Sequence, residues 1–160
     1  MNKPLIIEGH IVNHDREFDG RIAINTDTGL IESVEKLAGS SDLDTKNCLI
    51  FPGFTDLHVH AREDAQGSQN YKEGFRTASE AALHGGVTQF ADMPNNPLPP
   101  INDATYAEKE KIAKEHGLIP IVLYAGVGRE SHPLSRKVPF KVFMGHSIGN
   151  LFFKSLEELE

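Results

Sequence analysis

The sequence predicts a mixed α/β fold in two parts, a short β-rich region and a longer region in which strands and helices alternate. Three observations predict this. The first 50 residues hold short β-prone segments separated by turn residues. Later apolar segments alternate with helical ones, which is typical of a parallel sheet. Residues 119–127 are nearly all apolar, as in a strand buried on both faces. We therefore expect a small, partial β domain over 1–51 and an α/β domain over 52–160.

The β-rich region contains four short segments of β-branched and aliphatic residues. These segments are residues 5–7, 11–12, 21–24 and 30–34. Turn residues lie between them at 19–20 and at 27–29. Short strands that follow one another in this way predict a small antiparallel sheet.

The second region contains four strand segments and two complete helical ones. The expected strands are 54–60, 87–91, 119–127 and 140–144, and the expected helices are 71–84 and 103–116. Glycines follow both helices, and Asn102 or Asp103 can cap the second helix at its start. Another helix is expected to begin within 156–160.

Composition excludes several classes of protein. The 160 residues are too few for a complete (β/α)8 barrel, which needs about 200–250. A formal net charge of −7 argues against a nucleic-acid surface. The longest apolar run, 119–127, is too short to cross a bilayer, and no signal peptide is expected at the start. The single Cys48 excludes a disulfide scaffold within one chain and suits a reducing compartment, so we expect a cytoplasmic protein.

Two histidines lie at the end of the strand expected over 54–60. His58 and His60 are two residues apart, so both side chains are expected on one face of the strand. Two imidazoles so placed can share a metal ion, or they can be solvated or bonded to the backbone. Asp56 is expected on the same face, as a ligand, as a group that orients the ligands, or as a turn residue at the strand start.

Lys141 interrupts an otherwise apolar strand. Burial of an unpaired ammonium group is costly, so the side chain either extends to water or is held neutral. A neutral amine can combine with carbon dioxide to form a carbamate, whose two oxygens can bridge two cations.

Two residues after the strand ends could bind a carboxylate. The planar guanidinium of Arg62 suits a substrate carboxylate, although a surface ion pair with Glu63 or Asp64 is the alternative. Asn95 follows a proline-fixed turn and could donate to the same carboxylate, or it is an ordinary loop residue.

Three motifs in order resemble the amidohydrolase superfamily, and within it the dihydroorotase, hydantoinase and allantoinase branch. The first is PGFTDLHVHAR at residues 52–62, in which an Arg follows the His-x-His-x pattern. The second is GGVT at 85–88 followed by DMPNNP at 92–97, which is similar to the Met-Pro-Asn of dihydroorotases. The third is FKVFMG at 140–145, which resembles the segment of the carboxylated lysine. The resemblance implies the first four βα units of a TIM-type (β/α) barrel, preceded by part of a small β-sandwich domain.

The resemblance also implies roles for the site residues. His58 and His60 would bind the first of two Zn²⁺ ions, carboxylated Lys141 would bridge both ions, and Arg62 and Asn95 would hold the substrate carboxylate. The implied reaction is the reversible hydrolysis of L-dihydroorotate to N-carbamoyl-L-aspartate, a step of pyrimidine biosynthesis. The family's remaining metal ligands and its catalytic Asp come from later strands, so the resemblance implies no catalytic residue among these 160.

Two alternatives stay open. A hydantoinase, dihydropyrimidinase or allantoinase would act on a ring that lacks this carboxylate or places it differently, and an inactive fragment or scaffold would have no turnover. The sequence also departs from the usual His-x-His-Leu-Arg-x-Pro-Gly pattern, because Ala61 replaces the Leu and Asp64 and Ala65 replace Pro-Gly. Half a barrel would leave strand edges open, so we expect self-association and a homo-oligomer. The expected ligand is a small molecule, with no nucleic acid or membrane partner.

Overall fold

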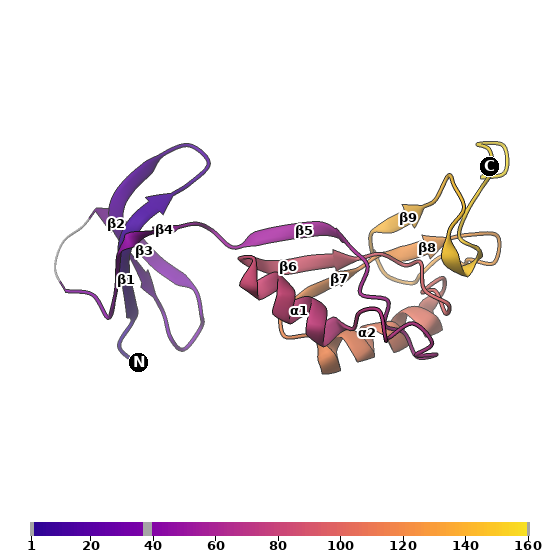
Figure 1. Cartoon of the computed structure of the whole chain (residues 1–160), viewed down its shortest axis with the longest axis horizontal. Helices are drawn as coiled ribbons and strands as arrows, with labels where there is room; N and C mark the ends of the chain where they lie inside the picture. Colours follow the sequence, from indigo (N-terminus) through magenta and orange to yellow (C-terminus); the bar gives the residue numbers. More distant parts are fainter. Residues whose placement is uncertain (1, 37–39, 160) are drawn as a thin grey trace. The chain divides into compact units, whose positions relative to one another are not determined.

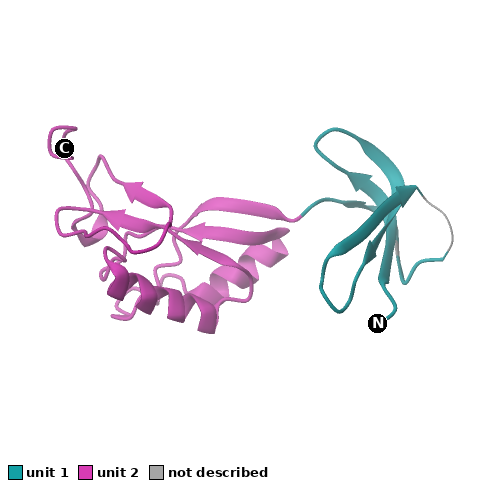
Figure 2. Ribbon diagram, turned by 180° about the vertical axis from the view of Figure 1, so that it is seen from behind, with its two compact units in different colours: residues 1–52 teal, residues 53–160 magenta. Residues whose placement is uncertain are grey.

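The structure is a computed structural model that describes residues 2–36 and 40–159. The chain divides into two compact units, Met1–Pro52 and Gly53–Glu160, which Figure 2 shows in different colours. Together they give the mixed α/β fold that the sequence predicts.

The first unit is a four-stranded sheet. Its strands are β1 (Leu5–Val12), β2 (Glu17–Ile24), β3 (Ile31–Lys36) and β4 (Leu43–Ile50), in the order β3-β2-β1-β4. The first three strands form antiparallel hairpins, but β4 lies parallel to β1. The prediction of a purely antiparallel sheet is wrong at this edge, because the chain returns from β3 to the free edge of β1 rather than adding a hairpin beside β3.

The second unit is built on a parallel three-stranded sheet. β5 (Phe54–Val59), β6 (Val87–Asp92) and β7 (Ile121–Leu123) lie in the order β5-β6-β7, and β8 (Ala125–Val127) pairs in parallel with β9 (Phe140–Val142). Helices α1 (Phe75–His84) and α2 (Asp103–His116) lie on the same side of the β5-β6-β7 sheet (Figure 1). A short 3-10 helix, η1 (Ile148–Asn150), follows β9. Parallel strands joined by helices bring the carboxyl ends of β5 and β6 to the same edge of the sheet.

The core of this unit lies between the two helices and the sheet. Phe75 of α1 and Phe90 of β6 are buried almost completely, and the α2 residue Tyr106 donates its hydroxyl to the Leu123 carbonyl at 3.0 Å. This bond satisfies the phenol where burial raises its pKa. These contacts pack both helices against the sheet.

Helix α2 has the bounds that the sequence predicts. The Asn102 side chain caps it by accepting from the Thr105 N–H at 3.0 Å, and Gly117 follows its last residue. Among the described residues no helix is long and apolar enough to cross a membrane.

Several predicted elements differ from the structure. The strands expected at 5–7 and 11–12 are the single strand β1, and the turn expected at 19–20 lies inside β2, where it pairs with β1. The helix expected over 71–84 begins only at Phe75, after the extended Gly74 at its N-cap. The strand expected over 119–127 is two strands, because the Tyr124 N–H bonds to Asp92 of β6 and the next N–H bonds to the Pro139 carbonyl. No helix begins at residue 156, where a turn closes between Leu156 and Leu159; Glu160 lies outside the described residues.

Candidate active site

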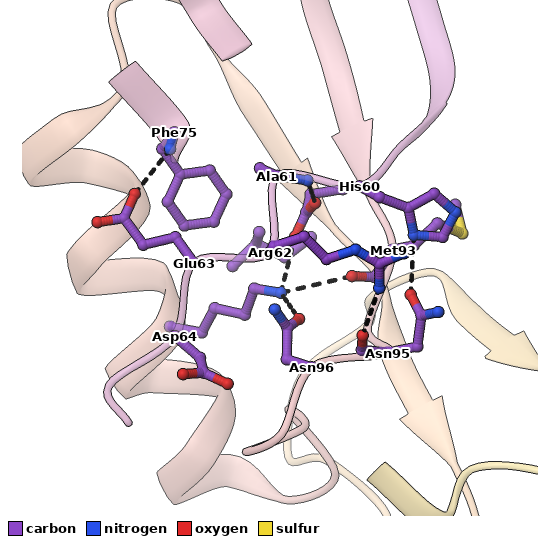
Figure 3. A network of polar contacts seen from close by, with 12 residues as sticks. His60, Ala61, Arg62, Glu63, Asp64, Phe75, Met93, Asn95 and Asn96 are labelled. Atoms are coloured by element: carbon purple, nitrogen blue, oxygen red, sulfur yellow. Dashed lines mark hydrogen bonds and ion pairs between the residues drawn. The ribbon is translucent and has the colours of Figure 1, made fainter. Parts of the chain in front are cut away.

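Three of the predicted site residues gather where β5 and β6 end. His60 and Arg62 follow β5, and Asn95 follows β6 (Figure 3). The two loops are joined at their base, because the Met93 N–H donates to the Val59 carbonyl at 2.8 Å. Residues 35 positions apart in the sequence thus become neighbours.

The two histidines lie side by side. The ring centroids of His58 and His60 are 5.2 Å apart, with His58 exposed and His60 half-buried. Burial lowers the pKa of His60, and the nearby charge of Arg62 lowers it further. A ring kept neutral in this way retains a lone pair that can bind a metal ion.

Asn95 determines which nitrogen of His60 is free. Its Oδ1 lies 2.9 Å from His60 Nδ1, and with the amide in this orientation the oxygen accepts, so Nδ1 carries the hydrogen. The lone pair is then on Nε2. Metal-binding histidines usually donate their second nitrogen in this manner, so this observation shows that His60 fits a metal ligand.

The histidine pair fits part of a zinc site. Zinc takes four ligands in structural sites and three protein ligands plus water in catalytic ones. In the part of the chain that the structure describes, no group of three or more His, Cys, Asp or Glu side chains could hold a metal ion. His58 and His60 would therefore supply two of the ligands, and the others must come from elsewhere.

Asp56 lies close to the histidines in sequence, but its carboxylate is hydrogen-bonded to the backbone. Its Oδ1 accepts from the His58 N–H at 2.9 Å. The pairing of β5 with β6 shifts register between Asp56 and Val59, so strict alternation does not hold along this part of the strand. Asp56 and His60 both line a cavity of about 270 Å³ beside α1. A ligand or orienting role for Asp56 stays a prediction.

Arg62 and Asn95, the predicted carboxylate-binding pair, are in contact. Arg62 has a positive φ of 60°, which is unusual for a residue with a Cβ. Its Nη1 donates to the Asn95 carbonyl at 2.9 Å. The alternative ion pairs with Glu63 and Asp64 do not form, because those carboxylates accept from the backbone. A cation is therefore held beside the histidine pair by the same residue that orients His60.

Lys141 lies on β9, where it pairs with Gly126 of β8. Its side chain is half-buried, and Nζ lies 5.3 Å from the centroid of the Phe143 ring. The structure places the amine against this ring and gives it no contact with His58 or His60. Its role as a bridging carbamate stays a prediction.

Sequence reasoning missed the polar groups that hold these loops. The buried Asp92 accepts from the Ala61 N–H at 2.8 Å and forms an ion pair of 2.7 Å with Lys109 of α2. Glu63 accepts from the Phe75 N–H at 2.6 Å, at the start of α1. Asp64 accepts from two N–H groups, those of Gly67 at 3.0 Å and Leu98 at 2.9 Å.

One signal could have identified Lys109. Tyr106, Lys109 and Ala113 have the i, i+3, i+7 spacing of one helix face, so a lysine lies on the apolar stripe of α2. All three residues are buried in the structure.

Comparisons with known proteins show which family the chain resembles. The sequence profile of the amidohydrolase family matches residues 49–139. The chain is 31% identical to the dihydroorotase of Pyrococcus horikoshii over 156 residues, which are 96% of this chain and 36% of that protein. It is 35% identical over 150 residues to the dihydroorotase of Methanothermobacter thermautotrophicus, covering 88% of this chain and 34% of that one.

Among solved structures, the fold is similar to that of the L-hydantoinase (dihydropyrimidinase) from Arthrobacter aurescens. The TM-score is 0.79 at 22% identity, over 96% of this chain and 35% of that one. The chain thus spans about a third of the length of the relatives it matches. With the profile covering more than half of its residues, the chain belongs to the amidohydrolase family.

Proposed function

We propose that this chain carries the part of a dihydroorotase site that the first four strands of a (β/α) barrel contribute. In this assignment β5, β6, the β7–β8 segment and β9 are those four strands, and the first unit is part of the small β domain that precedes the barrel. The reaction is the reversible, metal-dependent hydrolysis of L-dihydroorotate to N-carbamoyl-L-aspartate.

The observation that carries the proposal is the contact between Arg62 and Asn95 next to His60. The guanidinium is a fixed cation within reach of the metal-binding face, so it can bind the carboxylate of dihydroorotate. The Asn95 amide has two N–H groups and can donate to the same carboxylate while its oxygen holds His60. The identity of 31–35% to dihydroorotases supports this substrate.

The metal supplies the hydrolytic chemistry in this proposal. Bound zinc lowers the pKa of water toward neutrality and polarises the ring carbonyl. His58 and His60 would hold the ion, and Arg62 with Asn95 would bind the substrate carboxylate and so orient the ring. Carboxylated Lys141 would be a further metal ligand.

A second candidate is a hydantoinase or dihydropyrimidinase, favoured by the structural similarity to the Arthrobacter aurescens enzyme. The two candidates differ in the substrate carboxylate. L-dihydroorotate and dihydrouracil share one ring and differ by this group, so they form a matched pair of substrates.

Hydrolysis of both compounds by the zinc-loaded protein and by Arg62→Ala tests the proposal. We expect the wild-type protein to prefer dihydroorotate, and Arg62→Ala to lower kcat/KM for dihydroorotate alone by about 100-fold or more, as for loss of a charged hydrogen bond. Equal rates on both rings, unchanged in Arg62→Ala, would point to the second candidate. Zinc binding without turnover of either ring would identify an inactive member of the family.

A further inference from the structure

Lys109 is a buried lysine in the middle of α2. Its side chain is 3% exposed, and that of its ion-pair partner Asp92 is fully buried. A buried charge is costly unless it is paired and hydrogen-bonded, so a lysine here needs a physical reason.

The Lys109 amine contacts three groups at the end of β6 and in the loop that follows it. Nζ lies 2.7 Å from Asp92 Oδ2, in a charge–charge contact. It also donates to the Met93 carbonyl at 3.4 Å and to the side-chain oxygen of Asn96. Met93 precedes Asn95 in the sequence and Asn96 follows it, so the amine binds the turn on both sides of Asn95.

Asp92 extends the same contact to the loop after β5. Its second oxygen, Oδ1, accepts from the Ala61 N–H at 2.8 Å. Ala61 is the residue between His60 and Arg62. A single buried ion pair thus connects α2, the Asn95 loop and the backbone between the two residues that Asn95 contacts.

We propose that Lys109 is a positioning residue, which through Asp92, Met93 and Asn96 holds Asn95 where it fixes the His60 ring and the Arg62 guanidinium. The inference deepens the proposed function and rests on it for the identity of the metal and the substrate. The contacts of Lys109 with the loop do not depend on which ring is hydrolysed.

A purely stabilising role makes a different prediction. Replacing both members of a buried ion pair by neutral residues of similar size is often harmless to stability. Asp92→Asn keeps the acceptor for the Ala61 N–H, and Lys109→Met keeps the volume of the side chain while removing its charge. The double variant therefore removes the contacts of the Lys109 amine without leaving an unpaired charge.

The test measures the ring of His60 directly. In the wild-type protein at a pH of about 8.5, where the ring is neutral, ¹⁵N NMR is expected to show the hydrogen on Nδ1. In the Asp92→Asn/Lys109→Met variant we expect a mixture of both tautomers and a zinc affinity lower by about 10–100-fold, the usual effect of losing a group that orients a ligand. The exposed Lys111→Met on the same helix is the matched control and should change neither readout.

Asn96→Ala is an independent variant that leaves the ion pair intact. It removes one contact of the amine beside Asn95 and should shift the His60 tautomer in the same direction by a smaller amount. The inference is overturned if His60 keeps its hydrogen on Nδ1 in both variants, or if zinc affinity is unchanged in the double variant.

The design also separates this inference from the proposed function. If the variants no longer hold the hydrogen on Nδ1 of His60 and the wild-type protein hydrolyses neither ring, the positioning role is supported and the dihydroorotase assignment is rejected. If the wild-type protein shows turnover that depends on the substrate carboxylate and both variants keep the hydrogen on Nδ1, the dihydroorotase assignment is supported and the positioning role is rejected.

Discussion

The side-chain oxygen of Asn95 lies 2.9 Å from Nδ1 of His60, and the Asn95 carbonyl accepts from Arg62. One residue of the second loop therefore orients a candidate metal ligand and a candidate substrate-binding cation. In the proposed function, metal binding and ring orientation would be coupled through this residue.

Replacement of Asn95 should weaken metal binding although Asn95 is not itself proposed as a ligand. In Asn95→Ala the His60 ring loses its partner, and we expect zinc affinity to fall by about 10–100-fold in a calorimetric titration. Asn102→Ala is the control, because this residue caps α2 and its loss should cost about 1 kcal/mol of stability without changing the affinity. Equal affinities of the wild-type and Asn95→Ala proteins would contradict the orienting role.

The buried ion pair makes a prediction about stability. Lys109→Met alone leaves the Asp92 carboxylate buried and unpaired, so the free energy of unfolding in urea should fall by about 3–5 kcal/mol. Adding Asp92→Asn should restore most of this loss. A single variant within about 1 kcal/mol of wild type would show that water reaches Asp92 and that the pair is not dry.

Glu63 is predicted to stabilise the start of α1. Its carboxylate accepts from the Phe75 N–H at 2.6 Å and lies 2.5 Å from His116 Nδ1. Glu63→Ala leaves a buried N–H without a partner, which should cost about 1–3 kcal/mol in the same urea assay. Glu80→Ala, which breaks only the exposed pair with Arg76, should cost less than about 1 kcal/mol. If the two variants lose equal stability, the hydrogen bond from Phe75 to Glu63 stabilises the protein no more than an exposed ion pair does.

The open edge of β5 predicts self-association. Among the residues that the structure describes, β5 pairs within its sheet only with β6, and Leu57 is 65% exposed. An exposed apolar edge strand favours pairing with another chain, so Leu57→Lys should shift light-scattering masses toward the monomer. Leu83→Lys on α1 is the control. A wild-type protein that is monomeric at every concentration would contradict this prediction.

The sequence predicts the elements of this fold better than the contacts between them. Helix α2 has a cap and a terminating glycine within its own sequence, so its bounds can be predicted from local signals. The break between β7 and β8 at Tyr124 cannot be predicted from local signals, because it depends on hydrogen bonds to the backbone carbonyls of Asp92 and Pro139 on other segments. Likewise β4 is parallel because of where the free edge of β1 lies.

In the candidate site, too, the sequence predicts local features better than contacts between distant segments. The His-x-His spacing places two imidazoles 5.2 Å apart, and the motifs place Arg62 and Asn95 at adjacent strand ends. The supporting residues were missed because nothing near them in sequence marks their partners. Asp64, which departs from the usual proline, bonds to Leu98, 34 residues away. This bond connects the loop after β5 to the loop after β6.

The central claim is that His58 and His60 bind one metal ion together, and X-ray absorption at the zinc edge tests it most directly. With one equivalent of zinc, the wild-type protein should show two imidazole nitrogens at about 2.0–2.1 Å, and His58→Ala and His60→Ala should each lose one of them. An identical zinc spectrum in all three proteins would place the metal on other residues and contradict the account.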